Sequence, residues 1–266
     1  MDSRSDQKNA LVRDLDGEDL SHARLFFAAI LAIALGIFTF QYLIVRAVIP
    51  VDFSISYIIL NTTQPNFSSA FLNNYAHNPF DTAHLMSNVP FFVIVSAMIY
   101  GMAWYLQNQG FQLPSKFLLI NYAVMLLLLP FSISGISIWT SRIFDKGWSL
   151  GLSGINFALL GLFLTLFFSF TVFVTFRKHS SRVAGNTFVI LVSFALFVAV
   201  VSALIFYELK SPAVGVYAHF GGFLLGLVVP SLVGAYLTSE RKNQKILTVF
   251  ILCSSITIPA LFWIFL

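Results

Sequence analysis

Seven long stretches of this 266-residue chain contain no Asp, Glu, Lys or Arg. A helix needs about 20 residues to cross the ~30 Å hydrocarbon core of a bilayer, and each stretch supplies that length. Hydrophobic residues make up 58% of the chain and charged residues only 10%, which excludes an ordinary soluble domain. The sequence therefore predicts an all-α polytopic membrane protein with seven spans, at 25–45, 82–115, 117–141, 147–176, 183–207, 211–239 and 246–266.

Two other segments differ in composition from these stretches. Residues 53–80 are uncharged but rich in Asn, Ser, Thr and Pro, so we expect a long loop there instead of a span. Residues 1–24 carry six acidic and four basic side chains and few apolar ones, which is typical of a solvated, disordered tail. We therefore divide the chain into this tail and a membrane domain over 25–266.

The distribution of basic residues predicts the orientation in the membrane, because Lys and Arg are enriched in cytoplasmic loops. Eleven of the 15 Lys and Arg residues lie in the tail or in loops on its side of the membrane, and four at most lie on the other side. We therefore expect a cytoplasmic N-terminus and an external C-terminus. Because the basic residues sit in short loops, they do not indicate a nucleic-acid partner.

A few strongly polar residues within the predicted spans are the candidates for function, since polar groups at membrane depth are costly. His84 and Asn88 lie in the second span, Ser153 in the fourth and His219 in the sixth. Asn88, Ser153 and His219 each follow the charged residue before their span by about 10 to 13 Å along the helix, measured from the predicted external end. We therefore expect the serine hydroxyl, the imidazole and the amide at a similar depth, near the external side of the membrane.

Small residues beside these groups predict that two of the spans pack closely. His219, Gly222 and Gly226 share one face of the sixth span. Small residues let two helix backbones approach each other, which would bring the short Ser153 side chain within reach of His219. The fourth span carries a comparable face beside Ser153, made of Gly154, Ala158 and Gly161.

These residue types suit acyl transfer by a serine nucleophile. A serine hydroxyl attacks effectively when a base accepts its proton, and neutral imidazole is the usual base. The tetrahedral intermediate also needs hydrogen-bond donors, which His84, Asn88 and the backbone N–H of Ser153 can supply. No acidic residue lies within the hydrophobic stretches, so we expect a dyad of Ser153 and His219 and no third member.

Structural roles are the alternative for the same residues. Ser and Gly in membrane helices usually serve packing, and His84 with Asn88 could cap and tie down a loop. His77 is interpreted as an ordinary loop histidine. Cys253 is the only cysteine, which excludes an intrachain disulfide and a cysteine-based metal site, and we expect no metal or cofactor.

The chain contains "HLMSN" at 84–88, "GLSG" at 151–154 and "AHFGGFLLG" at 218–226. In their order, spacing and helix placement these motifs resemble those of the rhomboid intramembrane serine proteases. The resemblance covers about 25–240 and implies a six-helix core there. The stretch 246–266 then looks like the single C-terminal helix that some members of the family add.

The resemblance also implies roles for individual residues. Ser153 would be the nucleophile, His219 the base, and Phe157 the aromatic residue beside that histidine. His84, Asn88 and the Ser153 amide would stabilise the oxyanion. The supporting glycines would be Gly151, Gly154, Gly222 and Gly226.

The chain departs from the family in lacking the Trp-Arg pair common in the first external loop, here 50–81. It also departs in carrying Pro90, which we expect to kink the second span.

Together these features predict a serine endopeptidase that cleaves peptide bonds in or near transmembrane segments of other membrane proteins, with its site open to the external side. The alternative is a catalytically silent rhomboid-like protein that binds client helices, although the presence of both Ser153 and His219 argues against it. A seven-helix receptor would normally place its N-terminus outside, and a transporter would show repeats or paired intramembrane charges. The sequence indicates no particular oligomeric state.

Overall fold

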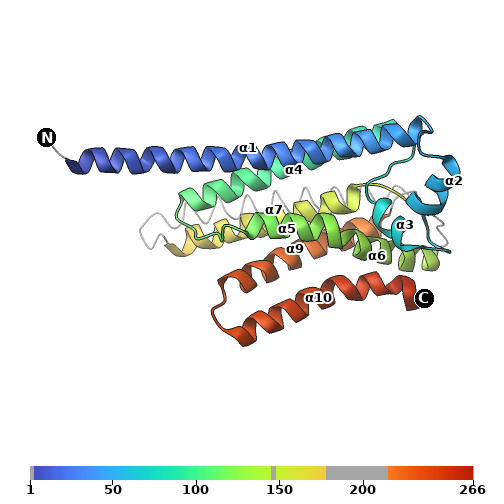
Figure 1. Ribbon diagram of the computed structural model, residues 1–266. Coiled ribbons are helices and arrows are strands. Elements are labelled where there is room, and N and C mark those ends of the chain that lie inside the picture. The colour runs from blue at the N-terminus through green and yellow to red at the C-terminus, as the bar shows by residue number, and fades with distance from the viewer. Residues whose placement is uncertain (1–2, 145–147, 178–214, 266) are drawn as a thin grey trace.

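The computed structural model describes residues 3–144, 148–177 and 215–265, and they form a bundle of long helices running along a common direction (Figure 1). Six helical segments of this part are long and apolar enough to cross a membrane. They are His22–Val45, Thr82–Asn108, Phe117–Ile143, Ser153–Val172, Val216–Thr238 and Lys242–Leu261. Six of the seven predicted spans are therefore confirmed as apolar helices of spanning length, and the other, 183–207, lies outside the described residues.

Helix α1 is longer than the first predicted span. It covers Ser3–Val45, so it continues into the segment 1–24, for which the sequence predicted a disordered tail. Leu, Arg and Ala recur in that segment, and these residues have high helix propensity. Only His22–Val45 has the apolar character of a span. The boundary at residue 24 is therefore a change of composition within one helix.

The third span is one continuous helical segment that contains a π-helical turn in its middle. Pro130 has no N–H, so it cannot bond to the carbonyl of Leu126 one turn earlier. The hydroxyl of Tyr75 donates to that carbonyl, and Asn74 Nδ2 donates to the Pro130 carbonyl at 3.2 Å. The irregular turn thus gives the preceding loop a place to bind. The rod consists of α5 (Phe117–Ala123), a π-helical turn η2 (Val124–Leu128) and α6 (Leu129–Phe144).

The predicted loop before the second span is folded onto the bundle. It contains α2 (Val51–Phe53), the π-helical turn η1 (Ser54–Ile58), β1 (Leu60–Asn61) and α3 (Phe67–Leu72). Strand β1 pairs antiparallel with β2 (Trp148–Ser149), directly before the fourth span. Asn73 and Asn74 are buried and both donate to the hydroxyl of Ser134 in α6, at 2.8 and 3.0 Å. The polar residues that exclude this segment from lipid therefore attach it to the helices.

The fourth and sixth spans meet through the small faces that the sequence predicts. A Cβ atom on Gly222 would lie 2.2 Å from the carbonyl oxygen of Gly154, and one on Gly226 would lie 2.1 Å from that of Ala158. Both contacts are with backbone atoms, which cannot rotate away, so only glycine permits this approach. The two spans are α7 (Ser153–Arg177) and α9 (Val216–Thr238).

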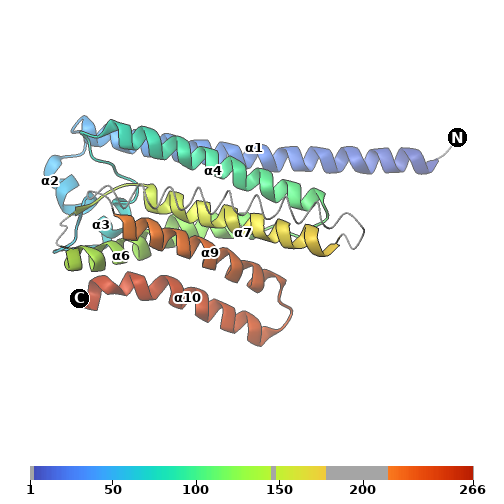
Figure 2. The same cartoon turned by 180° about the vertical axis from the view of Figure 1, so that it is seen from behind.

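Two further helices flank this pair. Helix α4 (Thr82–Asn108) packs on α7 and continues through Pro90, so the proline does not end it. Helix α10 (Lys242–Phe265) lies beside α9 and α6, on the opposite side of the bundle from α1 (Figures 1 and 2). The hydroxyl of Ser132 in α6 donates to the carbonyl of Ile256 at 2.7 Å, which joins α10 to the rest of the bundle.

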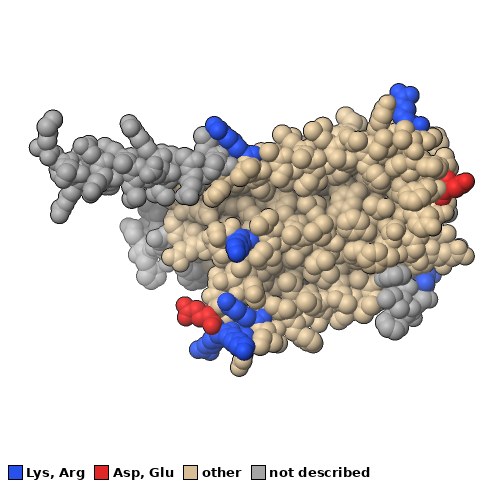
Figure 3. All heavy atoms as spheres, viewed as in Figure 1, with Lys and Arg blue, Asp and Glu red and all other residues tan. Residues whose placement is uncertain are grey.

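Charged side chains gather at the two ends of the bundle, and the broad middle of the face in Figure 3 is free of them. Lys116 precedes α5, and Arg241 and Lys242 join α9 to α10, at the end toward which the N-terminus lies (Figure 1). Arg46 and Arg142 adjoin the ends of α1 and α6 at the other end. This distribution is typical of a multi-pass membrane protein. The orientation in the membrane stays a prediction.

Candidate active site

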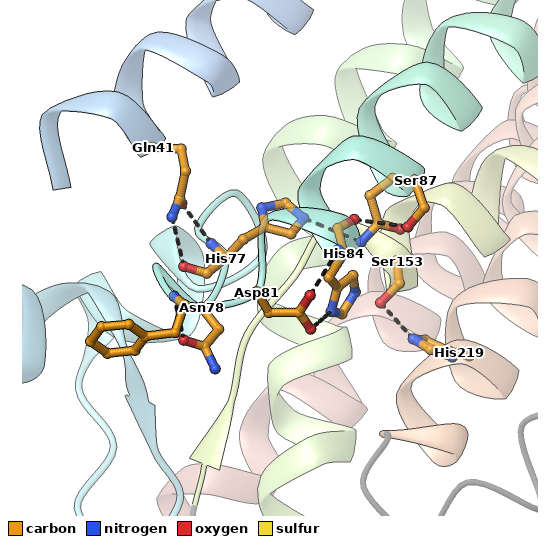
Figure 4. A network of polar contacts seen from close by, with 10 residues as sticks. Gln41, His77, Asn78, Asp81, His84, Ser87, Ser153 and His219 are labelled. Carbon is orange, nitrogen blue, oxygen red and sulfur yellow. Dashed lines mark hydrogen bonds and ion pairs between the residues drawn. The ribbon is translucent and has the colours of Figure 1, made fainter. Parts of the chain in front are cut away.

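Ser153 and His219 form the centre of the candidate site. Ser153 is the first residue of α7 and is partly exposed, whereas His219 lies one turn into α9 and is buried. Ser153 Oγ and His219 Nε2 are 2.5 Å apart and hydrogen-bonded (Figure 4). The close backbone contact of α7 with α9 makes this possible, because a serine side chain is too short to cross an ordinary helix spacing of about 8–10 Å.

Phe157 orients the imidazole of His219. It lies one helical turn after Ser153, and its ring stacks on that of His219 with centroids 4.8 Å apart and an angle of 7° between the planes. A parallel contact of this kind limits rotation of the imidazole about its own side-chain bonds. Nε2 is therefore kept facing the serine hydroxyl.

The chain turns sharply just before the serine. The backbone of Gly151 has φ +127°, which residues other than glycine rarely adopt. Its N–H donates to the carbonyl of Asn73 at 2.9 Å. A Cβ at this position would lie 3.4 Å from His84 Nε2 and 3.7 Å from Ser153 Oγ. Glycine thus leaves open a small space that the hydroxyl and an imidazole nitrogen both border.

His84, a predicted oxyanion donor, faces that space from the first turn of α4. Asp81 caps this helix by accepting the backbone N–H of His84 at 3.0 Å, and its other oxygen lies 4.0 Å from His84 Nδ1. The cap determines where α4 begins, and with it the position of the ring. In the tautomer with a proton on Nε2, His84 can donate into the space above Gly151.

Asn88, the second predicted donor, is buried one turn further along α4, and its amide has two partners. Its Oδ1 lies 3.3 Å from Asn156 Nδ2, which donates to it, and its Nδ2 lies 3.2 Å from His77 Nε2. One N–H of the amide therefore faces His77. The other N–H is the one that an oxyanion would use.

The sequence did not single out two residues of this network. Asn156 lies three positions after Ser153, and an amide within an otherwise apolar stretch is the signal that could have found it. His77 had been interpreted as an ordinary loop histidine, yet it is 2% exposed and touches both predicted donors. Nothing in its local sequence indicates this, because its partners come from other elements.

Neither family models nor curated proteins nor solved structures match this chain. The described residues contain no group of His, Cys, Asp and Glu side chains suited to a metal ion.

Proposed function

We propose that this protein is an intramembrane serine endopeptidase of the rhomboid type, which cleaves peptide bonds in or near transmembrane segments of other membrane proteins. The observation that carries the proposal is the hydrogen bond between Ser153 Oγ and His219 Nε2 inside a bundle of apolar helices. Nucleophile and base within hydrogen-bond reach, with the base oriented by a third group, is the arrangement that covalent catalysis requires. Phe157 supplies the orienting contact.

The first half of the reaction forms an acyl-enzyme. His219 Nε2 accepts the hydroxyl proton while Ser153 Oγ bonds to the carbonyl carbon of the scissile peptide, and the carbonyl oxygen gains a negative charge. The tetrahedral intermediate collapses as the C–N bond breaks, and the imidazolium of His219 gives its proton to the leaving amine. The peptide's acyl group is then esterified to Ser153.

The second half hydrolyses the ester. A water molecule gives a proton to His219 as its oxygen attacks the acyl carbon, and the same nitrogen returns the proton to Ser153 Oγ as the ester bond breaks. Water must reach the site for this step. Ser153 is partly exposed at the start of α7, beside the loop that precedes α4, which is a more accessible position than the middle of the bundle.

Three groups are proposed to stabilise the negative oxygen. The backbone N–H of Ser153 is at the N-terminus of α7, where helical N–H groups have no intrahelical partner and the helix dipole favours negative charge. His84 borders the same space through Nε2. Asn88 offers its second amide N–H.

The substrate must present an accessible carbonyl. In a transmembrane helix the backbone carbonyls are hydrogen-bonded and screened by side chains, so the segment must unwind locally before attack. Substrates with Gly, Ser or Ala near the cut are therefore favoured. The excess of Lys and Arg on the N-terminal side supports a site open to the external side of the membrane.

The proposal is tested by incubating the purified protein in lipid vesicles with a single-span substrate that carries a different tag at each end. We expect two fragments whose new termini, read by mass spectrometry, lie in or near the span. A matched substrate with a leucine-only span should be cut more slowly, because it unwinds less readily. An intact substrate that remains bound to the protein would instead support the silent, client-binding alternative.

Removing either side-chain donor is expected to slow turnover while the fold persists. Asn88→Ala should lower kcat about 10²-fold, and His84→Ala should have a similar effect, since one lost oxyanion donor typically costs this much. Asn121→Ala is the matched control, because Asn121 is also buried but donates to the carbonyl of Phe117 in its own helix, α5. If Asn88→Ala and His84→Ala unfold in mild detergent while the control does not, a structural tie is the better interpretation.

A further inference from the structure

We propose that His77 is a positioning residue of the oxyanion site, which holds the amide of Asn88 so that one N–H faces the substrate. The inference rests on the proposed function and names a residue outside the three motifs. His77 belongs to the connection between α3 and α4, seven residues before His84. Its ring nevertheless lies between α1 and α4, against the residues proposed as donors (Figure 4).

The backbone of His77 is held by α1. Gln41 Nε2 donates to the carbonyl of His77 at 2.9 Å, and the N–H of His77 donates to Gln41 Oε1 at 2.9 Å. Both residues are buried, with Gln41 only 4% exposed. A side-chain amide that satisfies both backbone groups of one residue holds that residue in place, and a buried glutamine in a spanning helix needs such partners.

The orientation of the Asn88 amide follows from a backbone carbonyl. One side-chain amide atom of Asn156 lies 2.9 Å from the backbone carbonyl oxygen of Asn88. A carbonyl oxygen can only accept, so this Asn156 atom is the nitrogen Nδ2. The same nitrogen lies 3.3 Å from the Asn88 side chain, which must therefore present its oxygen there. Asn88 Nδ2 is left facing His77 Nε2 at 3.2 Å, and that ring nitrogen must accept.

The protonation state of His77 agrees with this assignment. Burial lowers the pKa of His77 to about 4, with a further lowering from the neighbouring His84 and an opposing effect from Asp81. The ring is therefore neutral near pH 7, and the accepting role of Nε2 toward Asn88 then assigns the remaining proton to Nδ1. Nδ1 is buried and has no partner among the described side chains, so the bond to Asn88 is the polar contact assigned to this ring.

His77 also contacts the other proposed donor. Its ring meets that of His84 edge to face, with centroids 5.4 Å apart and an angle of 82° between the planes. The contact limits movement of the His84 ring away from Gly151. One loop histidine thus positions both side chains that are proposed to bind the oxyanion, and α1 holds that histidine.

The test uses pairs of substitutions at position 77 in the full-length protein. His77→Gln keeps an acceptor near the place of Nε2, whereas His77→Phe keeps a ring and loses the acceptor. We expect His77→Phe to lower kcat roughly 10-fold with KM little changed, a typical size for coupling within one hydrogen-bond network. His77→Gln should recover most of the rate. If the Phe variant does not fold, His77→Asn replaces it, because its shorter side chain does not reach Asn88.

A double-mutant cycle separates positioning from a structural effect. If His77 acts through Asn88, the variant with both His77→Phe and Asn88→Ala should be no slower than Asn88→Ala alone. Asn78→Ala is the control, since Asn78 is exposed in the same loop and its side chain accepts only the N–H of Phe80 among the described contacts. An unchanged kcat in His77→Phe, additive losses in the cycle, or a Gln variant as slow as Phe would each overturn the inference. A wild-type protein that cuts no transmembrane substrate would overturn the proposed function, and the inference with it.

Discussion

Ser153→Ala and His219→Ala are each expected to reduce cleavage of a transmembrane substrate to background, a loss of about 10⁴-fold or more. The reason is that nucleophile and base act as one unit, so removing either abolishes the covalent route. The 2.5 Å contact between Ser153 Oγ and His219 Nε2 is the basis for treating them as one unit. A fluorophosphonate reagent should label the wild-type protein at Ser153, and labelling should fall sharply in His219→Ala.

The serine variant should remain folded, which makes the result interpretable. Ser153 is partly exposed at a helix start, and the substitution removes one oxygen atom and its bond to His219. Ser169→Ala is the matched control, because Ser169 lies on the same helix and donates to the carbonyl of Thr165 at 2.8 Å. It should cleave and label as the wild type does. A folded Ser153→Ala protein that still cuts its substrate at the wild-type rate would show that the site is elsewhere.

Gly226→Ala is expected to impair both stability and activity, although it adds a single methyl group away from the dyad. The new Cβ would lie 2.1 Å from the carbonyl oxygen of Ala158, so α7 and α9 must separate. Overpacking of this kind costs about 1–3 kcal/mol. A displacement of about 1 Å between nucleophile and base can cost about 10²-fold in rate. We expect a lower unfolding temperature in detergent and slower labelling of Ser153.

Gly101→Ala is the matched control for this substitution. Gly101 lies in α4, and a Cβ there would have no atom within 4 Å. Replacing an exposed helical glycine by alanine reduces the conformational freedom of the unfolded chain, so this variant should be as stable as the wild type or slightly more stable. Equal unfolding temperatures and equal labelling in both glycine variants would contradict the close contact of α7 with α9.

The six described apolar helices and the meeting of Ser153 with His219 could be predicted because each follows from a local rule. An apolar stretch of about 20 residues has no alternative to a helix in lipid, since every backbone group must be bonded internally. The same cost makes a serine or histidine within such a stretch conspicuous. Small residues at helical spacing then predicted the contact that joins Ser153 to His219, and α7 and α9 do meet there.

Other features could not be predicted in this way. The disordered tail expected at 1–24 is helical from Ser3, because charge indicates contact with water but does not exclude a helix. The loop after α1 contains only short elements and no helix of spanning length. The pairing of β1 in this loop with β2 could not be predicted, because it depends on how the tertiary structure positions the segment just before α7.

The sequence by itself thus determined which segments form apolar helices and which side chains carry the candidate chemistry, since both depend on how a single helix interacts with lipid. Only the tertiary structure decided how the donors are held. His77 meets Gln41 from 36 residues earlier, and Asn156 meets Asn88 across 68 residues. A buried polar atom forms its hydrogen bond with the partner that the packing of distant elements brings within about 3 Å. No local sequence pattern encodes which partner that is.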